Sequence, residues 1–492
     1  MNFTSTPFVL FFTTITTLYY VCHPKWRWAL LLVGSCYFYM AFLPKYILIL
    51  FALIIIDFFL AKKIETSIGK KRKILFIVSI ISNVGILFVF KYFNFFNDNM
   101  HNLANFIHWN YPIGSLSLIL PLGLSFHTFQ SLSYVIEVYK GKYKAERHLG
   151  IYALYVLFFP QLVAGPIERP EHLLPQLKTD HKFSWKNIQE GVRLMAWGFL
   201  KKLVIADRLA LSVTYVYGHI SSSSSLSILI TIIFFTFQLY ADFSGYSDIA
   251  RGSAKALGID VTRNFEQPYF SKSVAEFWRR WHISLSSWFR DYFYFPLVYS
   301  KHQVTKNWLY ACIILTFIVT GLWHGAGWTF IIMGALHGIY IVTGTITKSW
   351  RDKTVATKMG VCLQKVRGPF QIIFTFALVS FSWIFFRSPN LSTAITFIKQ
   401  LFINWNVPLN TISLQYIIKP FDTLGFSQTD LLISIVGIGI ILFVEHFQNH
   451  KPIGVIFDEQ SLFVRSVTYS SLFLVIFVFG IYTTSQFIYF QF

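Results

Sequence analysis

Apolar runs of roughly membrane-spanning length recur along the whole chain. A spanning helix needs roughly 17–25 predominantly apolar residues. Segments that approach this pattern lie at 7–22, 28–43, 46–61, 74–92, 113–136, 149–165, 194–217, 225–247, 308–323, 327–346, 370–386, 431–447 and 466–489. Several are short or contain polar residues, so some are expected to be re-entrant. The pattern predicts about 10 to 12 true spans in one all-α, polytopic membrane domain that covers residues 1–492.

Basic residues between the apolar runs set the expected orientation, because Lys and Arg are enriched in cytoplasmic loops. The segment AKKIETSIGKKRK, residues 61–73, is strongly basic and is placed in the cytoplasm. The N-terminus then lies outside. It carries no positive charge before its first apolar run, which indicates a first span and not a cleaved signal peptide. The weakly charged loop at 95–112 falls outside by the same count.

The later basic segments place one turn deep in the protein. Residues 251–282 and 348–368 are both basic and are expected in the cytoplasm. Residues 308–346 therefore leave the cytoplasm and return to it, which puts the turn WHGAG at or beyond mid-membrane. The polar, proline-rich stretch 165–190 cannot span and is expected to form a rigid cap on the cytoplasmic face.

The composition agrees with a membrane protein and excludes a soluble globule. Of the 492 residues, 54% are hydrophobic and only 13% are charged, whereas soluble domains carry about 25% charged residues. The net charge of +20 comes from short basic clusters, which fits contact with anionic membrane lipid and does not indicate a nucleic-acid partner. No bound metal is expected, since the cysteines show no ligand spacing; they are Cys22, Cys36, Cys312 and Cys362.

The segment EFWRRWHISLSSWFRDY, residues 276–292, has the pattern of one amphipathic helix at a membrane surface. One helical face would be an aromatic stripe in the membrane, formed by Phe277, Trp278, Trp281, Leu285, Trp288 and Tyr292. The opposite face would carry Arg279, His282, Ser286 and Arg290. Arg279, Arg280 and Arg290 either meet lipid headgroups or receive the phosphates of a donor substrate, because guanidinium groups offer forked hydrogen-bond donors. The pattern alone favours a structural role for His282.

Two carboxylates lie in the stretch QLYADFSGYSDIARG, residues 238–252. Ionisable groups at membrane depth are costly and are usually paired or functional. Asp242 and Asp248 are six residues apart and point to different helix faces, which argues against a paired acid–base site. Gly245 between them suggests a break in the helix. An ion pair with Arg251 or with the arginines of 279–290 is the favoured interpretation.

The stretch GLWHGAGWTFIIMGALHG, residues 321–338, holds two histidines in an apolar run. If this segment were one helix, His324 and His337 would be separated by roughly 20 Å and could not act on the same atom. Gly325 and Gly327 permit a bend at His324, and a buried neutral imidazole there could serve as a general base. A structural role is the alternative for His324 and the favoured interpretation for His337. His127, also in an apolar run, could line the same cavity.

Five stretches occur in this order: PLGLSFHTFQSLSYVIEVYKG, VAGPIERPEHLLPQL, FQLYADFSGYSDIARG, NFEQPYFSKSVAEFWRRWHISLSSWFRDYFYFPL and GLWHGAGWTFIIMGALHG. They resemble the membrane-bound O-acyltransferases, in particular the bacterial alginate and peptidoglycan O-acetyltransferase branch, with teichoic acid D-alanyl transfer proteins as more distant relatives. Together the stretches lie within residues 121–338. The first third of the chain has the hydrophobic character expected of this family, and the part after about residue 350 contains no stretch specific to it.

The resemblance implies a helical fold with re-entrant and interfacial helices around a central pore, and a catalytic core at 121–338. It also implies that His324, in its WHG context, and His282, in RRWHISL, are the catalytic histidines. Asp242, His127 and Trp323 are taken as pore-lining, and Arg279, Arg280 and Arg290 as donor-binding. For His337 the resemblance adds little.

The resulting hypothesis is acyl transfer across a bacterial inner membrane. The donor would be a cytoplasmic thioester, acetyl-CoA or another acyl thioester, with no bound cofactor. The acceptor would be an extracytoplasmic glycan or a partner acetyltransferase that passes the acyl group on. Two rival functions stay open at this point. One is a proton-coupled transporter or flippase, although no inverted repeat of broken helices is evident. The other is a non-catalytic scaffold.

Overall fold

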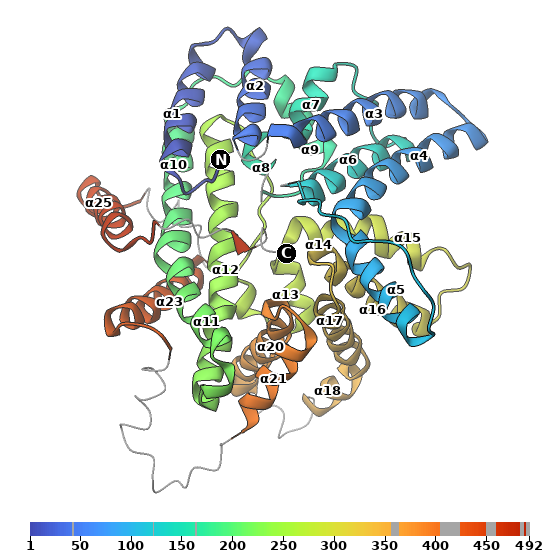
Figure 1. Cartoon of the computed structure of the whole chain (residues 1–492). Coiled ribbons are helices and arrows are strands. Elements are labelled where there is room, and N and C mark those ends of the chain that lie inside the picture. Colours follow the sequence, from blue (N-terminus) through green and yellow to red (C-terminus); the bar gives the residue numbers. More distant parts are fainter. Residues whose placement is uncertain are drawn as a thin grey trace, which may run out of the picture. The chain divides into compact units, whose positions relative to one another are not determined.

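The computed structural model describes residues 1–41, 44–121, 123–162, 165–355, 364–403, 424–448, 459–482 and 487–488. Throughout this part of the chain every regular element is helical (Figure 1). The fold is therefore all-α, as predicted. The backbone divides into two compact units. The first unit comprises Met1–Met195 and Ser247–Arg263, and the second comprises Ala196–Tyr246 and Asn264–Phe492.

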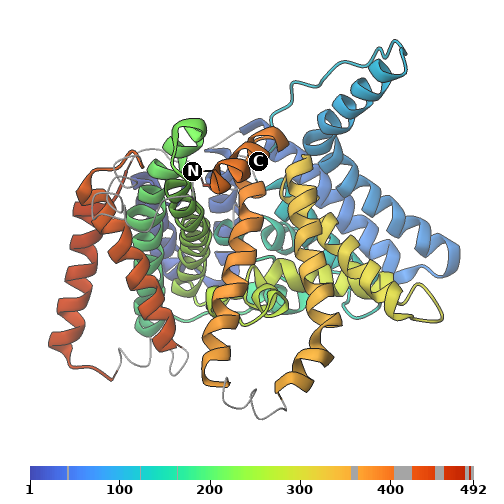
Figure 2. The ribbon, with the colours of Figure 1, turned by 90° about the horizontal axis from the view of Figure 1, so that it is seen from below.

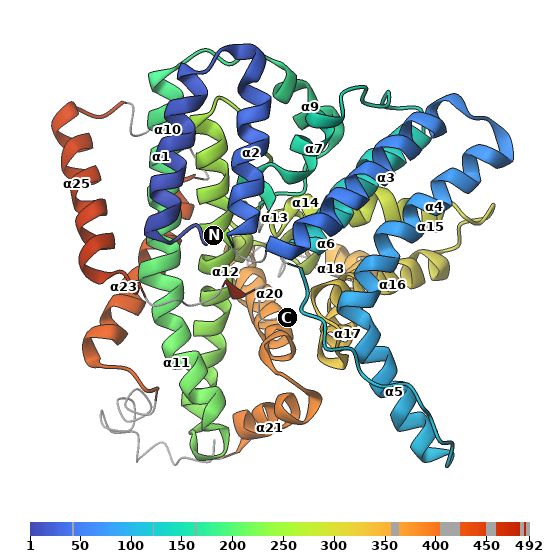
Figure 3. The same ribbon diagram turned by 45° about the horizontal axis from the view of Figure 1, so that its top comes forward.

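The first unit contains the N-terminal helices and the polar segment 165–190. Its helices are α1 (Thr6–Val21), α2 (Arg27–Met40), α3 (Ile47–Thr66), α4 (Gly69–Leu87), α5 (Phe93–Phe106), α6 (Leu124–Tyr139), α7 (Leu149–Leu157), α8 (Phe159–Leu162), α9 (Pro170–Lys178) and most of α10 (Trp185–Phe199). Short turns η1 (Pro24–Trp26) and η2 (Pro44–Tyr46) flank α2, and a π-helical turn, η3 (Phe88–Tyr92), joins α4 to α5. Helices α1 and α2 form an antiparallel pair through Phe8, Phe11 and Phe38 (Figure 3).

The second unit contains the helices that carry both histidines of the stretch 321–338. They are α11 (Asp207–Gly218), most of α12 (Ser225–Ala256), α13 (Val274–Arg280), α14 (Ile283–Phe289), α15 (Phe295–Val298), α16 (Lys306–His324), α17 (Trp328–Ile346), α18 (Lys348–Val355), α20 (Gln364–Arg387), α21 (Leu391–Phe402), α23 (Gln428–Gln448) and α25 (Leu462–Phe479). Short turns connect them: η4 (Leu200–Ala206) and η7 (Arg290–Tyr294) are π-helical, and η5 (Ile220–Ser222) and η6 (Pro268–Phe270) are 3₁₀ turns.

Seven helices in the described residues are long and apolar enough to cross a membrane, which makes this a multi-pass membrane protein. They lie at Gly69–Phe106, Ser225–Ala256, Lys306–His324, Trp328–Ile346, Arg367–Arg387, Gln428–Phe447 and Leu462–Phe479. The number is below the 10 to 12 predicted because other apolar segments form helices that are shorter or more charged. The predicted span at 466–489 extends past the described residues.

Two predicted spans are wrong in their boundaries. Residues 109–121, assigned to the loop and to the start of the span at 113–136, form no helix. Pro112 and Pro121 cannot donate backbone hydrogen bonds, and the Asn94 side chain instead pairs with the backbone N–H and C=O of Leu116, both at 2.8 Å. The segment 149–165 is interrupted at Phe158, so α7 has only nine residues. Pro160 in the first turn of α8 favours this break.

Close contact between α16 and α17 positions the residues of the candidate site. A Cβ atom at Gly321 would lie 2.2 Å from the carbonyl oxygen of Phe330, and one at Gly334 would lie 2.2 Å from that of Phe317. Small residues thus allow the two backbones to touch, as is common between membrane helices. Helix α20 packs against α17 in the same unit (Figure 2).

Candidate active site

His324 is the last residue of α16, at the turn that connects it to α17. Its side chain is 4% exposed, and its ring contacts Trp323 at 4.8 Å and Phe386 of α20 at 5.7 Å between centroids. The turn depends on glycine, because a Cβ atom at Gly325 would lie 2.1 Å from the Phe330 ring. The structure therefore confirms the predicted bend at His324.

His282 lies between α13 and α14, not inside one helix. The prediction of a single amphipathic helix over 276–292 is wrong: α13 ends at Arg280, and the backbone at His282 is left-handed, with φ 43° and ψ 56°. A non-glycine residue in this conformation costs about 1–3 kcal/mol, and such residues concentrate at functional sites.

Asn264 holds this turn in place. Its backbone oxygen accepts a hydrogen bond from Ile283 N–H at 2.9 Å, and its side-chain oxygen accepts one from Ser284 N–H at 3.4 Å. These bonds satisfy the first N–H groups of α14, which have no partners within the helix. Asn264 is itself buried, so the strained turn is fixed from the protein interior.

The aromatic residues of this segment do not form a membrane-facing stripe. Phe277, Trp278, Trp281, Leu285 and Trp288 are all buried in the protein. Trp281, for example, packs against Phe265 and Trp383 with centroids 5.0 and 5.4 Å away. The helical-wheel argument failed because the break at His282 turns the two short helices in different directions.

The structure brings His282 and His324 together around one tryptophan. The Trp323 ring contacts His282 at 6.0 Å and His324 at 4.8 Å, so the two imidazole centroids lie within about 11 Å of each other, the combined length of these contacts. Phe243 of α12 meets His282 edge to face at 4.6 Å. His282, Trp323 and His324 thus belong to one aromatic cluster, which we call the histidine cluster.

Burial sets the protonation of His282. The side chain has no exposed surface, and desolvation lowers its pKa to about 3. His282 is therefore neutral near pH 7, and a neutral imidazole can accept a proton or donate one hydrogen bond. This is the form that a general base or a hydrogen-bonding partner needs.

His337 lies apart from the histidine cluster. The helix is interrupted at 325–327, so the assumption of one continuous helix is wrong. Contacts of Gly334 and Gly338 with residues 314–318 place His337 about nine helical residues from His324 along α16, or roughly 13 Å. It is packed among Trp278, Trp383 and Phe277. The two histidines are still too far apart to contact one reacting atom.

The three arginines proposed for donor binding have different environments. Arg280 forms an ion pair with Glu276 at 2.7 Å, and Arg290 forms one with its neighbour Asp291 at 2.8 Å. Arg279 is exposed on α13 and pairs with no acid among the described residues. Of the three arginines, Arg279 is therefore the most available to bind a phosphate group.

Asp242 is paired, but with a partner that the sequence did not suggest. Its carboxylate lies 2.7 Å from Lys202 and accepts a hydrogen bond from Ile488 N–H at 2.8 Å. Lys202 also pairs with Asp207 at 2.7 Å, and all three charged side chains are buried. The predicted pairing with Arg251 is confirmed for Asp248, at 3.6 Å, and is wrong for Asp242.

The predicted helix break at Gly245 is also wrong, because α12 runs without interruption from Ser225 to Ala256. A Cβ atom at Gly245 would lie 2.9 Å from the carbonyl oxygen of Gly198. The glycine therefore permits close helix packing next to Lys202 and Asp242.

His127 belongs to the first unit, where it is buried on α6. Neither ring nitrogen has a hydrogen-bond partner in the described part of the chain. Its predicted role in lining a cavity stays a prediction.

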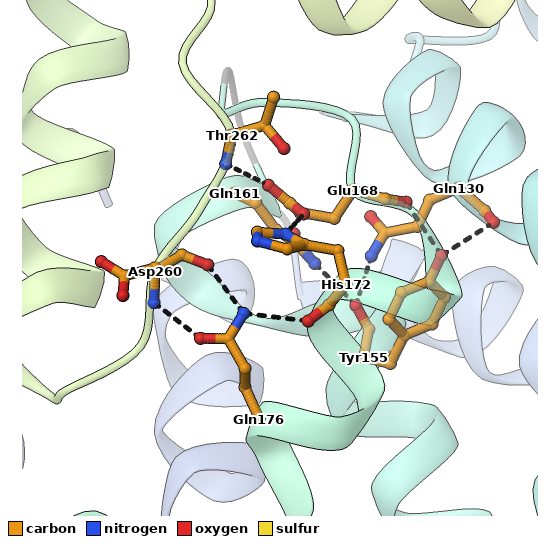
Figure 4. Close-up of polar contacts among 8 residues, drawn as sticks. All are labelled: Gln130, Tyr155, Gln161, Glu168, His172, Gln176, Asp260 and Thr262. Carbon is orange, nitrogen blue, oxygen red and sulfur yellow. Dashed lines mark hydrogen bonds and ion pairs between the residues drawn. The ribbon is translucent and has the colours of Figure 1, made fainter.

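The predicted cap at 165–190 includes α9 and is fixed within the first unit by a polar cluster around Glu168 (Figure 4). The buried Glu168 carboxylate accepts a hydrogen bond from Thr262 N–H at 2.5 Å and pairs with His172 Nδ1 at 2.6 Å. The Gln176 side chain bonds both the N–H and the C=O of Asp260. The hydrogen bond with Glu168 raises the pKa of His172.

Sequence reasoning missed Asn264, Lys202 and the α20 residues Trp383 and Phe386. Two lysines in the apolar run FLKKLVIAD were a usable signal, because buried charges need partners. Asn264 gave no comparable signal, since its role depends on a contact with residues that are 19 and 20 positions away in the sequence.

Comparison with known proteins shows which family the chain belongs to. Residues 148–387 match the sequence profile of the family described as MBOAT, membrane-bound O-acyltransferase family. Over 427 residues the chain is 33% identical to the peptidoglycan O-acetyltransferase of Helicobacter pylori, covering 81% of this chain and 77% of that protein. The chain belongs to the membrane-bound O-acyltransferase family.

Other family members extend the likeness. The chain is 32% identical over 460 residues to the probable alginate O-acetylase AlgI of Pseudomonas putida, covering 92% of this chain and 89% of that protein. It is 30% identical over 248 residues to the teichoic acid D-alanyltransferase of Bacillus subtilis, covering 48% and 62%. The resemblance in the five stretches is thus confirmed, and the protein is an O-acyltransferase. The profile match includes the whole histidine cluster and excludes His127.

Proposed function

We propose that this enzyme O-acetylates a polysaccharide of the bacterial cell envelope. The relatives named above support this, because they are named as acetylases of alginate and peptidoglycan or as a D-alanyltransferase of teichoic acid. The acyl donor is a cytoplasmic thioester, acetyl-CoA, which acts as a substrate and not as a bound cofactor. The protein works in the inner membrane and passes the acetyl group to a glycan or to an extracytoplasmic partner acetyltransferase.

The observation that carries the proposal is the histidine cluster. Two buried histidines contact one tryptophan, and one of them, His324, ends a helix at a glycine-dependent turn. A water-poor environment strengthens hydrogen bonds to a reacting carbonyl, and neutral imidazole is a competent base near pH 7.

In the proposed reaction, His324 accepts the proton of the acceptor hydroxyl. The hydroxyl oxygen attacks the thioester carbonyl, the new C–O ester bond forms and the C–S bond breaks. The proton held by His324 passes to the departing thiolate, so the products are an O-acetyl ester and a free thiol. His282 donates a hydrogen bond that orients the donor carbonyl, and Arg279 contacts the phosphates of the donor.

Reconstitution in liposomes tests this function against transport. Acetyl-CoA labelled in the acetyl group is supplied on one side of the membrane, and thioester cleavage and labelled ester are measured with and without a proton gradient. Acyl transfer predicts thioester cleavage that requires an acceptor and does not require the gradient. Movement of an envelope precursor that depends on the gradient, together with indifference to acetyl-CoA, would establish the transporter alternative.

A further inference from the structure

A pocket in the first unit lies at the turn between α1 and α2. Its volume is about 430 Å³. Four aliphatic residues of its lining, which we call the apolar floor, are Leu31, Ile151, Leu177 and Ile259. Lys25, Arg27 and Lys178 bring three positive charges to the same pocket. It therefore combines an apolar surface with a cationic one, which is the pattern of an amphiphilic anion site.

The place of the pocket in the chain points to the edge of the membrane. Helix α1 is an apolar helix of 16 residues that ends at Val21, and α2 begins at Arg27. The turn between them reads Pro24-Lys25-Trp26, and Trp26 is 59% exposed. Tryptophan and lysine at the end of an apolar hairpin are typical of the level of the lipid headgroups. By the basic-loop rule this end faces the cytoplasm.

The charges of the pocket leave one positive charge in excess. Arg27 pairs with Asp180, and Lys178 pairs with Glu146, each at 2.5 Å. Lys25 is exposed and has no ion pair with any residue in the described ranges. One uncompensated ammonium group matches the single negative charge of a phosphodiester.

His148 adds a hydrogen-bond donor. Its Nδ1 accepts a hydrogen bond from Ile151 N–H at 3.2 Å, so in the neutral ring the proton resides on Nε2. The ring is held edge to face against Trp28, with centroids 4.6 Å apart. His148 and Trp28 both line the pocket, which gives it a fixed polar group beside a large apolar one.

We propose that this pocket binds the headgroup of an anionic phospholipid. Lys25 and His148 contact the phosphate, and the apolar floor receives the glycerol and the first methylene groups of the lipid. A free phosphate ester, including that of a soluble thioester donor, offers the same phosphate chemistry. The apolar floor and the position at the hairpin end favour the lipid, and this inference is independent of the acyl-transfer chemistry.

The chain offers a matched control for Lys25. Helix α2 is preceded by Pro24-Lys25-Trp26 and followed by a second 3₁₀ turn, Pro44-Lys45-Tyr46. Both lysines are exposed, but they lie at opposite ends of a 14-residue helix, roughly 21 Å apart, and Lys45 does not line the pocket. Lys25→Glu and Lys45→Glu therefore change the net charge equally, but only the first changes a residue that lines the pocket.

Native mass spectrometry of the full chain in detergent measures the binding. Phosphatidylglycerol or phosphatidylcholine is titrated into the unmodified protein and both variants, and melting temperatures without lipid check that each variant is folded. The expected result is one saturable binding site for phosphatidylglycerol. Its affinity should be roughly 30-fold weaker in Lys25→Glu, because this change removes the attraction of one positive charge and adds the repulsion of one negative charge. Lys45→Glu should bind like the unmodified protein.

Three outcomes would overturn the proposal. The first is equal weakening by both charge reversals, which would indicate general surface attraction. The second is equal affinity of the unmodified protein for phosphatidylcholine and phosphatidylglycerol. The third is displacement of the lipid by millimolar inorganic phosphate or coenzyme A, which would assign the pocket to a soluble phosphate ester. If Lys25→Glu fails to fold, Lys25→Gln replaces it, with an expected weakening of about fivefold.

Discussion

His282 combines complete burial with a left-handed backbone, and both properties cost free energy. A residue kept at such a cost is held there by its surroundings, in this case by the two hydrogen bonds that Asn264 accepts from Ile283 and Ser284. The imidazole must also remain neutral, because the pKa of His282 is lowered to about 3 by desolvation. These features make its contribution to stability dependent on pH.

Acidification should therefore destabilise the protein through His282. The unfolded state binds a proton near pH 6.5 and the folded state only near pH 3, so the stabilisation is complete above pH 6.5 and is lost as the pH falls through this window. About one pH unit or more below pH 6.5, His282 should contribute a loss of roughly 1.4 kcal/mol per pH unit. Thermal melting of His282→Gln should show a correspondingly shallower pH dependence; an unchanged slope would show that His282 does not titrate in this way.

The buried charges around Lys202 make an asymmetric prediction. Lys202→Met leaves Asp207 and Asp242 buried without their cation, and unpaired buried charges cost about 3–5 kcal/mol. Asp242→Asn leaves Lys202 paired with Asp207 and should cost less. Denaturation in detergent compares the two variants. A larger loss for Asp242→Asn would contradict the assignment of Lys202 as the centre of this cluster.

Among the elements, the hairpin of α16 and α17 does most to place His324. Some glycines of this hairpin are tightly surrounded by neighbouring atoms, and others are not. Gly325 faces the Phe330 ring, whereas a Cβ atom at Gly344, near the end of α17, would meet no neighbouring group within 4 Å. The same substitution should thus have opposite consequences at the two sites.

Gly325→Ala should destabilise the protein by about 1–3 kcal/mol, because the added methyl group overlaps the Phe330 ring. Gly344→Ala should be neutral or slightly stabilising, since alanine favours a helix. Melting temperatures measure both. Adding Phe330→Leu to Gly325→Ala should recover part of the loss; no recovery would mean that the methyl group disturbs the turn in another way.

Local pattern predicted the helical elements well and their interruptions poorly. The hairpin of α16 and α17 and the bend at His324 followed from apolar spacing and glycine positions. The break at His282 did not, because it depends on Asn264 through contacts distant in sequence. The ion pair of Asp242 with Lys202 was not predicted for the same reason, since it depends on the packing around Gly245. Residue roles in the site came from family resemblance and not from periodicity.

At the scale of the whole molecule, the basic loops predict which ends of the helices face the cytoplasm. Ile68, in the turn between α3 and α4, should face the cytoplasm, and Phe106, at the end of α5, should face outside. The two side chains are 86% and 83% exposed, so they are matched for labelling.

Cysteine labelling tests this orientation directly. In a background without native cysteines, intact cells are treated with a membrane-impermeant maleimide. Phe106→Cys should react and Ile68→Cys should react only after the cells are opened. The reverse labelling pattern would show that the protein has the opposite orientation in the membrane, with the α1–α2 turn outside.

The most direct test of the central claim is acetyl transfer by matched histidine variants. Purified protein with its acceptor and labelled acetyl-CoA is assayed for thioester cleavage and ester formation in the unmodified chain, His324→Ala and His337→Ala. Both histidines are buried in the same hairpin, so equal amounts of folded protein in the membrane serve as the control. We expect transfer to fall by at least about 100-fold, the contribution of a general base, in His324→Ala and to persist in His337→Ala. Normal transfer by folded His324→Ala would contradict the account.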